Sequence, residues 1–97
     1  MTNYTVRVEL HNADSDDYEN LHDEMRKQGF HKQINVDSGS YELPTAEYSK
    51  VSDELSSNDI LKKAQVAANK VKPKPEPSIL VTGSTSIRVF SGLKKIK

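Results

Sequence analysis

The regular alternation of apolar and polar residues near the start of the chain is the feature that most limits the folds open to it. Tyr4, Val6, Val8 and Leu10 share one parity, and the residues between them are polar. Since successive side chains of a strand point to opposite faces, this pattern predicts a half-buried β-strand over residues 4–10. The apolar face of that strand has to be covered by segments that follow it.

Two later segments carry apolar residues at the three-to-four spacing of an amphipathic helix. The first follows an acidic link in which any residue of Asp14–Asp16 can cap the helix, and Gly29 is suited to end it. The second follows Ser56–Asn58 and stops before the proline-rich connector Lys72–Pro77. The apolar positions of the two helices are Tyr18, Leu21, Met25, Ile60, Leu61, Ala64, Ala67, Ala68 and Val71.

The remaining segments favour further strands, separated by turn-forming residues at 37–40 and 83–86. Pro44 lies inside one of these strands, where its missing N–H predicts a bulge, a kink or an edge position. The predicted strands are residues 30–36, one strand somewhere within residues 41–52, residues 79–82 and, as a candidate short fifth strand, residues 87–90.

The resulting order, strand–helix–strand–strand–helix–strand, is that of an α+β ferredoxin-like βαββαβ sandwich with two helices on one face of an antiparallel sheet. Ninety-seven residues suit one domain, which we place at 1–93, with a basic tail at 94–97. A chain this short buries only about 60–65% of its unfolded surface. We therefore expect a homodimer that covers the other sheet face, with segment 87–90 pairing with a neighbouring subunit.

Several classes of protein are excluded or disfavoured by composition. The chain has no cysteine, so disulfides, thiolate chemistry and cysteine-bound zinc are excluded. It has no signal-peptide pattern and no apolar run near the roughly 18 residues that span a bilayer, so we expect a cytoplasmic protein without a membrane partner. The four glycines do not cluster into a phosphate loop, and we expect no small-molecule cofactor.

Charge is distributed unevenly along the chain, although the net charge is zero. Residues 1–59 hold 13 acidic and five basic residues, whereas residues 60–97 hold nine basic residues and one acidic residue. This asymmetry fits a basic face for polyanions. It fits equally a fold in which the two halves simply pair with each other.

The end of the first strand and the link after it form the first candidate for chemistry. Glu9, His11, Asp14, Asp16 and Asp17 lie close together in the sequence. Carboxylates in this position can hold Mg²⁺ or act as a base near a phosphodiester. The alternative is that the aspartates cap the next helix and Glu9 is a solvated surface residue.

Histidines and lysines form the other candidates. His11, His22 and His31 can relay protons, and a pair of histidines can cleave RNA without a metal by activating the 2′-hydroxyl. A solvated surface position is the alternative for each. The basic residues of the C-terminal third can contact phosphate or can form a solvated helix face, and they are Lys62, Lys63, Lys70, Lys72, Lys74, Arg88, Lys94, Lys95 and Lys97.

Several segments of the chain, in order and spacing, resemble the GhoS-type family of small bacterial proteins. The resemblance covers most of the chain and includes no unique catalytic signature. The matching segments are Tyr4–Leu10, Asp17–His22, Gly29–Phe30, Tyr41–Tyr48, Ala64–Val71 and Leu80–Thr82.

The resemblance implies an endoribonuclease antitoxin of a type V toxin–antitoxin system, which cuts the mRNA of a small membrane-damaging toxin. It also implies a dimer with a ferredoxin-like fold similar to the CRISPR-associated Cas2 nucleases. The family pattern has an aspartate where this chain has Glu9, and a basic residue of the first helix where it has His22. We therefore expect Glu9 and His22 to be the catalytic residues, with no resident metal except a possible Mg²⁺.

The leading hypothesis is thus an endoribonuclease or RNA-binding antitoxin acting on single-stranded mRNA. One alternative is a non-catalytic regulatory module of prophage or plasmid type that binds nucleic acid or protein. Another is a purely structural or interaction protein. The basic residues that we expect to contact RNA are Arg7, Arg26, Lys32, Lys62 and Lys63.

Overall fold

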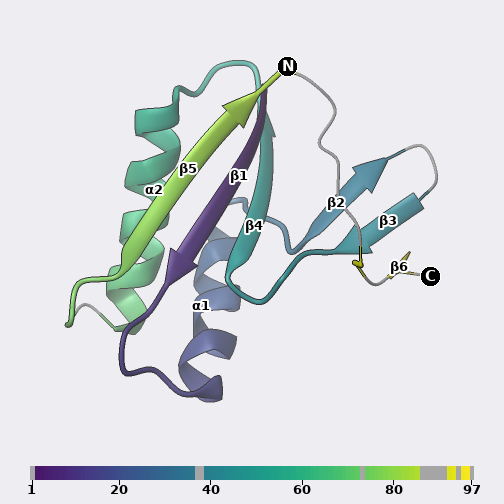
Figure 1. Ribbon diagram of the computed structural model, residues 1–97. Coiled ribbons are helices and arrows are strands. Elements are labelled where there is room, and N and C mark those ends of the chain that lie inside the picture. Colours follow the sequence, from purple (N-terminus) through teal and green to yellow (C-terminus); the bar gives the residue numbers. More distant parts are fainter. Residues whose placement is uncertain (1, 37–38, 73, 86–91, 94, 97) are drawn as a thin grey trace.

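The described residues form a small α+β structure with two helices and two antiparallel sheets, arranged as β4-β1-β5 and β2-β3-β6 (Figure 1). The computed structural model describes residues 2–36, 39–72, 74–85, 92–93 and 95–96. The elements are β1 (Thr2–Glu9), α1 (Ser15–Lys27), β2 (Gln33–Val36), β3 (Gly39–Glu42), β4 (Glu47–Ser52), α2 (Ser57–Val71), β5 (Ser78–Ser84) and β6 (Lys95–Ile96). Among these helices, none is long and apolar enough to cross a membrane.

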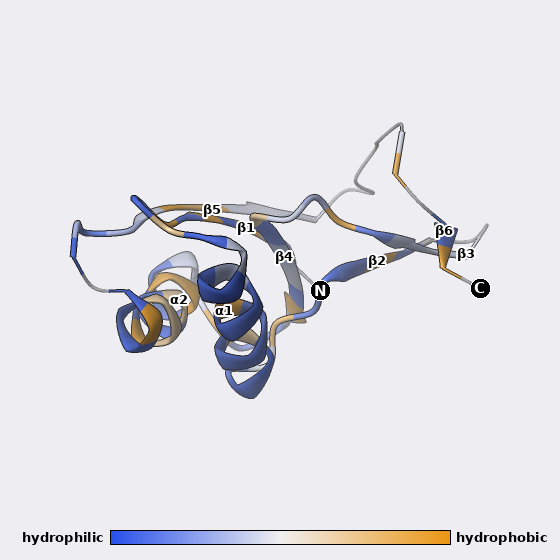
Figure 2. Ribbon diagram, turned by 90° about the horizontal axis from the view of Figure 1, so that it is seen from below, coloured by the Kyte–Doolittle hydropathy of each residue, from blue (hydrophilic) through white to orange (hydrophobic). Residues whose placement is uncertain are grey.

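The central strand β1 divides the main sheet into a covered face and an open face. Its register aligns Val6 with Tyr48 of β4 and with Val81 of β5, so these three side chains point to the same side. Both helices lie against that side (Figure 2). Arg7 and Glu9 have the opposite parity and point to the face that carries no helix.

The core lies between the helices and the covered face, and it confirms the predicted apolar stripes. Tyr48, Phe30 and Leu21 are among its largest fully buried side chains. Leu61 and Val71 belong to the predicted stripe of α2 but are only partly covered. The buried members of the core are Tyr4, Val6, Val8, Leu10, Leu21, Met25, Phe30, Tyr48, Ile60, Ala64, Ala67 and Ala68.

Both helices begin with a capping box, in which a side chain and a backbone amide satisfy each other's hydrogen bonds. Asp14 accepts a bond from the backbone of Asp17, whose carboxylate accepts one in return from the Asp14 backbone. Ser56 and Asp59 do the same for α2. Among the residues predicted as possible caps of α1, Asp14 is the N-cap in the structure.

The prediction of one strand somewhere within residues 41–52 is wrong in number, because this part of the chain contributes to two strands, β3 and β4, that belong to different sheets. β3 ends at Glu42, and the chain turns back through a bond from the Glu47 amide to the Pro44 carbonyl, 2.9 Å long. Pro44 has no N–H to continue a ladder, so the break falls where a kink was predicted. The predicted strand over 30–36 is also divided, since His31 pairs with Ser49 of the main sheet and β2 starts at Gln33.

The predicted turn at residues 83–86 starts too early, because β5 continues through Gly83 and Ser84. Gly83 lies opposite Tyr4, and a Cβ atom there would come within 2.9 Å of the Tyr4 ring. Glycine therefore allows the strand to continue beneath an aromatic ring. The candidate fifth strand at 87–90 lies outside the described residues, and in the predicted tail Lys95–Ile96 pairs with β3.

Candidate functional site

A cluster of polar side chains gathers on the open face where β1 ends. Glu9 is the last residue of β1 and lies opposite Ser78, the first residue of β5. His11 follows in the link, and its Nε2 lies 2.8 Å from the Ser78 hydroxyl. Its other ring nitrogen, Nδ1, lies 3.9 Å from the Glu9 carboxylate. The imidazole is thus placed between a carboxylate and a hydroxyl on the solvent-exposed surface.

The link that carries His11 is held in place by Tyr18 of α1. The Tyr18 hydroxyl accepts a bond from the Leu10 amide (3.0 Å) and donates one to the Leu10 carbonyl (3.3 Å). Leu10 is buried, and Asn12 has a φ of 55°, which asparagine tolerates better than most residues. The packing of the first helix therefore fixes where the chain turns away from β1 and where His11 projects.

Arg7 completes the cluster by lying on the same face of β1 as Glu9. A shallow pocket of about 140 Å³ is lined by Arg7, Glu9, Ser78, Ile79 and Leu80. This volume is below the range of sites that enclose a whole small molecule. The pocket can instead receive one charged group of a longer ligand, with the guanidinium supplying positive charge.

A second cluster lies on the covered side of the sheet, around His22 of α1. Its Nδ1 lies 2.5 Å from the hydroxyl of Tyr48, and the two rings meet edge to face with centroids 5.6 Å apart. Burial and then the nearby Lys32 ammonium lower the pKa of His22, against weaker opposing effects of Asp23 and Glu19. Burial raises the pKa of Tyr48, so its phenol stays neutral.

Lys32 is bound to the turn between β3 and β4. Its ammonium donates to the carbonyl of Pro44 and, over 3.0 Å, to that of Glu47. It also lies 5.0 Å from the centroid of the Tyr48 ring, within reach of a cation–π interaction. Burial lowers the pKa of Lys32 to about 8, although Glu42 and Glu47 act in the opposite direction.

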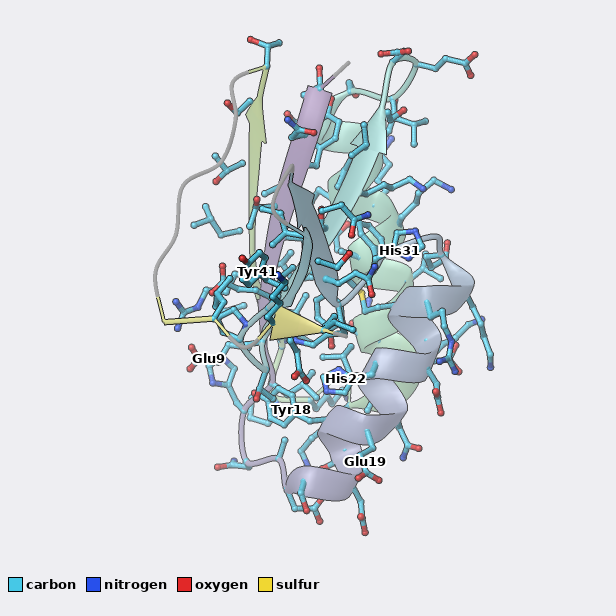
Figure 3. The ribbon with its side chains drawn as sticks, turned by 90° about the vertical axis from the view of Figure 1, so that its right-hand side faces the viewer. Glu9, Tyr18, Glu19, His22, His31 and Tyr41 are labelled. Carbon is cyan, nitrogen blue, oxygen red and sulfur yellow. The ribbon has the colours of Figure 1, made fainter. Side chains whose placement is uncertain are left out.

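The structure does not bring the two predicted catalytic residues together. Glu9 points to the open face of the sheet, whereas His22 contacts Tyr48 on the covered side. Figure 3 shows His22 on α1 and Glu9 at the margin away from that helix. Glu9 instead meets His11, which the sequence offered only as one of three histidines.

The basic residues predicted to contact RNA are also dispersed. Arg26 projects from α1 and pairs with Asp23 at 2.7 Å, both side chains being well exposed. Lys62 and Lys63 lie near the start of α2, where the hydrogen bonds with Ser56 lower the pKa of Asp59 and the two lysines add a weaker effect in the same direction. Arg26 on α1 and the two lysines of α2 lie in the helix layer, and Lys32 lies beside Tyr48 on the covered side. Of the predicted basic residues, only Arg7 therefore shares the open face with Glu9.

The acidic link is mainly a helix cap. Asp14 and Asp17 form the capping box of α1, which confirms that alternative for these two residues. Within the described part of the chain, no group of three or more His, Asp or Glu side chains is arranged to hold a metal ion. Ser78 was missed by sequence reasoning, because it lies 67 positions from His11 and only strand pairing brings it there.

Together these features define a class of protein, a small α+β domain with two helices on one face of an antiparallel sheet and a polar cluster on the other. No protein-family model matches the sequence, and neither does any curated protein. Among solved structures, the chain is similar to an acylphosphatase from Bacillus subtilis. The two share 20% sequence identity with a TM-score of 0.48, over 98% of this chain and 94% of that chain.

Proposed function

We propose that this protein is a ferredoxin-like, GhoS-type antitoxin that binds single-stranded mRNA on its open sheet face and cleaves it without a metal. The observation that carries the proposal is the position of His11 between the Glu9 carboxylate and the Ser78 hydroxyl, beside Arg7. A base, an acid and a fixed positive charge are the three groups that RNA transesterification needs.

In the proposed reaction, the Glu9 carboxylate removes the proton from a ribose 2′-hydroxyl, whose oxygen attacks the adjacent phosphorus. The imidazolium of His11 gives its proton to the 5′-oxygen as the P–O bond to that oxygen breaks. Arg7 stabilises the extra negative charge on the phosphorane. The products are a 2′,3′-cyclic phosphate and a 5′-hydroxyl end, so atoms and charge balance without a metal.

Ser78 is a positioning residue in this proposal, because its hydroxyl bonds to the imidazole and fixes the orientation of the ring. The role of acid passes from His22, which the resemblance implied, to His11. His22 is bonded to the buried Tyr48 and its pKa is lowered, so it is a poorer source of protons near neutral pH.

The test is cleavage of an end-labelled, AU-rich single-stranded transcript by the purified chain, with and without EDTA. We expect cleavage in both conditions and products that carry a 2′,3′-cyclic phosphate. The control substrate has a 2′-deoxyribose at the cut position and should stay intact. Cleavage that EDTA abolishes, or that produces no cyclic phosphate, would contradict the mechanism.

A second candidate is an RNA-binding module without cleavage, and the exposed position of Glu9 and His11 favours it, because no burial fixes these two groups for catalysis. In this case the same transcript is retained but not cut, and retention falls steeply as salt rises. No retention at low salt would exclude both candidates.

The proposal includes a homodimer in which a second copy covers the outer edge of β5, because the open face that the sequence assigned to the dimer is here occupied by RNA. Among the described strands, β5 lies at one side of the sheet β4-β1-β5, and Leu80, which faces the open side with Arg7, is 64% exposed. Unpaired strand edges are suited to pairing with another chain. Light scattering after size exclusion tests the dimer, and a monomer at high concentration would contradict it.

A further inference from the structure

A second and larger cavity lies between β4, β2 and the start of β1. Its volume is about 380 Å³, and its polar lining includes Asn3, His31, Gln33, Asn35, Ser49 and Lys50. This volume is within the range of small-molecule sites. None of the described residues that line the groove carries a carboxylate, so the lining is better suited to a neutral or anionic ligand than to a cation.

The carboxamides of β2 are oriented by their own hydrogen bonds. Asn35 Oδ1 accepts bonds from Gln33 Nε2 (3.1 Å) and from the Ser40 hydroxyl (2.6 Å). The Asn35 amide nitrogen therefore supplies donors, while the Gln33 carbonyl oxygen supplies an acceptor. A fixed donor beside a fixed acceptor is complementary to the hydrogen-bonding edge of a nucleobase.

Lys50 contributes a positive charge to the lining of the groove. Its ammonium lies 3.4 Å from the Gly29 carbonyl and 5.9 Å from the centroid of the Phe30 ring. Gly29 has a φ of +88°, and a Cβ atom there would come within 2.5 Å of the Lys50 nitrogen. Glycine at this position thus allows the lysine to lie against the backbone, with N–H groups left to contact a phosphate.

His31 supplies a flat ring at the junction of the two sheets. Its backbone is fixed by two bonds with Ser49, of 2.8 and 2.7 Å, and its side chain is exposed. Histidine is among the side chains on which unstacked RNA bases stack. The groove therefore combines a stacking surface, a base-edge donor and acceptor, and a phosphate contact.

We propose that this groove binds one base of a single-stranded RNA together with its phosphate, and so sets sequence preference at a distance from the cut. The proposal rests on the RNA-cleaving function inferred above. Both sites use odd-numbered residues of β1, Asn3 at one end and Glu9 at the other, so one strand of RNA along the open face reaches both. Six residues of strand separate them by about 20 Å, a span of a few nucleotides.

The first experiment titrates the full chain with each of the four nucleoside 5′-monophosphates and follows backbone and side-chain amide signals by NMR. We expect shifts at Gln33, Asn35 and Lys50, and an affinity at least about fivefold weaker in Asn35→Ala. Asn20→Ala, on the exposed side of α1, is the matched control and should bind like the wild type. An absence of shifts in the groove, or equal binding by Asn35→Ala, would overturn the proposal.

A second variant, Lys50→Gln, lies on β4 and so does not disturb the β2–β3 hairpin. It tests recognition of the phosphate separately from recognition of the base. Lys50→Gln should weaken binding of the monophosphates but leave binding of the uncharged nucleosides unchanged. Exposed Lys74→Gln is its control. Equal loss for nucleosides and monophosphates would contradict the assignment of Lys50 to the phosphate.

The final experiment sequences the products of a randomised RNA after cleavage by wild type and Asn35→Ala. We expect Asn35→Ala to lose the base preference a few nucleotides from the cut, whereas the control Asn20→Ala should keep it. An unchanged preference overturns the groove proposal while the proposed function stands. If no RNA is cut, the proposed function fails, and the nucleotide titrations still decide whether the groove is a base-binding site.

Discussion

His22 on α1 and Tyr48 on β4 share a hydrogen bond of 2.5 Å between the imidazole Nδ1 and the phenol hydroxyl. The bond joins the first helix to the main sheet across 26 positions of sequence. Since Tyr48 is fully buried, its hydroxyl has no access to water as an alternative partner. The pair should therefore contribute both to stability and to the response of stability to pH.

Tyr48→Phe keeps the buried ring and removes the hydroxyl. We expect the free energy of unfolding to fall by about 1 kcal/mol, the usual net contribution of a hydrogen bond between neutral groups. Urea denaturation followed by circular dichroism measures the change in midpoint. A midpoint equal to that of the wild type would mean that water replaces the bond at His22 without cost.

The pH dependence of stability should show the lowered pKa of His22. Below the ordinary value of 6.5, the unfolded chain binds a proton that folded His22 binds less readily, so stability falls as pH falls from 7 towards 5. His22→Gln should flatten this part of the profile, whereas His31→Gln, at an exposed histidine, should not. The same slope in His22→Gln and wild type would assign the effect to other groups.

Cleavage of RNA should depend on Glu9 and His11 rather than on His22. Glu9→Gln retains size and removes the base, and His11→Ala removes the acid, so each should lower the cleavage rate by about 10²- to 10⁴-fold. Glu76→Gln, at an exposed glutamate of the connector, is the matched control and should cut normally. A larger loss in His22→Ala than in His11→Ala would return the catalytic role to His22.

Lys32 should stabilise the turn before β4 rather than contact RNA, because its ammonium donates to the carbonyls of Pro44 and Glu47. Lys32→Met retains the aliphatic stem and should lower the free energy of unfolding by about 1–2 kcal/mol. RNA retention at fixed salt should change less than twofold. A clear loss of RNA affinity in a folded Lys32→Met would place the lysine in the RNA interface, as the sequence suggested.

The cap of α2 provides a prediction that is independent of function. Ser56→Ala removes the side-chain acceptor for the Asp59 amide and should cost about 1 kcal/mol in thermal or urea unfolding. Ser57→Ala, one position later and inside the helix, should change stability by only a few tenths of a kcal/mol. Equal effects of the two substitutions would argue against the capping box.

Much of the fold is predictable from local pattern. The parity of Tyr4 to Leu10 identified β1 and its buried face, and the spacing of Leu21 and Met25 identified the buried face of α1. The break near Pro44 was visible as a proline inside a strand. The assignment of β3 and β4 to different sheets could not be predicted, because it depends on which distant strands pair with the residues before Pro44 and with those after it.

The candidate site shows the same division. Glu9 and Arg7 were identified because strand parity and residue type are both local properties. The contact of His11 with Ser78 and that of His22 with Tyr48 were hidden, because each joins residues far apart in sequence. The groove around Asn35 was missed for the same reason, since β2, β4 and β1 each supply part of its lining.

By itself, the sequence determined the two helices, the first strand and the buried side of each, because periodicity and capping act over a few residues. Only the tertiary structure decided which polar side chains meet. It placed Glu9 with His11 and Ser78 on the open face and His22 with Tyr48 and Lys32 on the covered side. The physical reason is that the antiparallel register of β1 with β4 and β5 selects those neighbours, and a register is a property of several segments packed together.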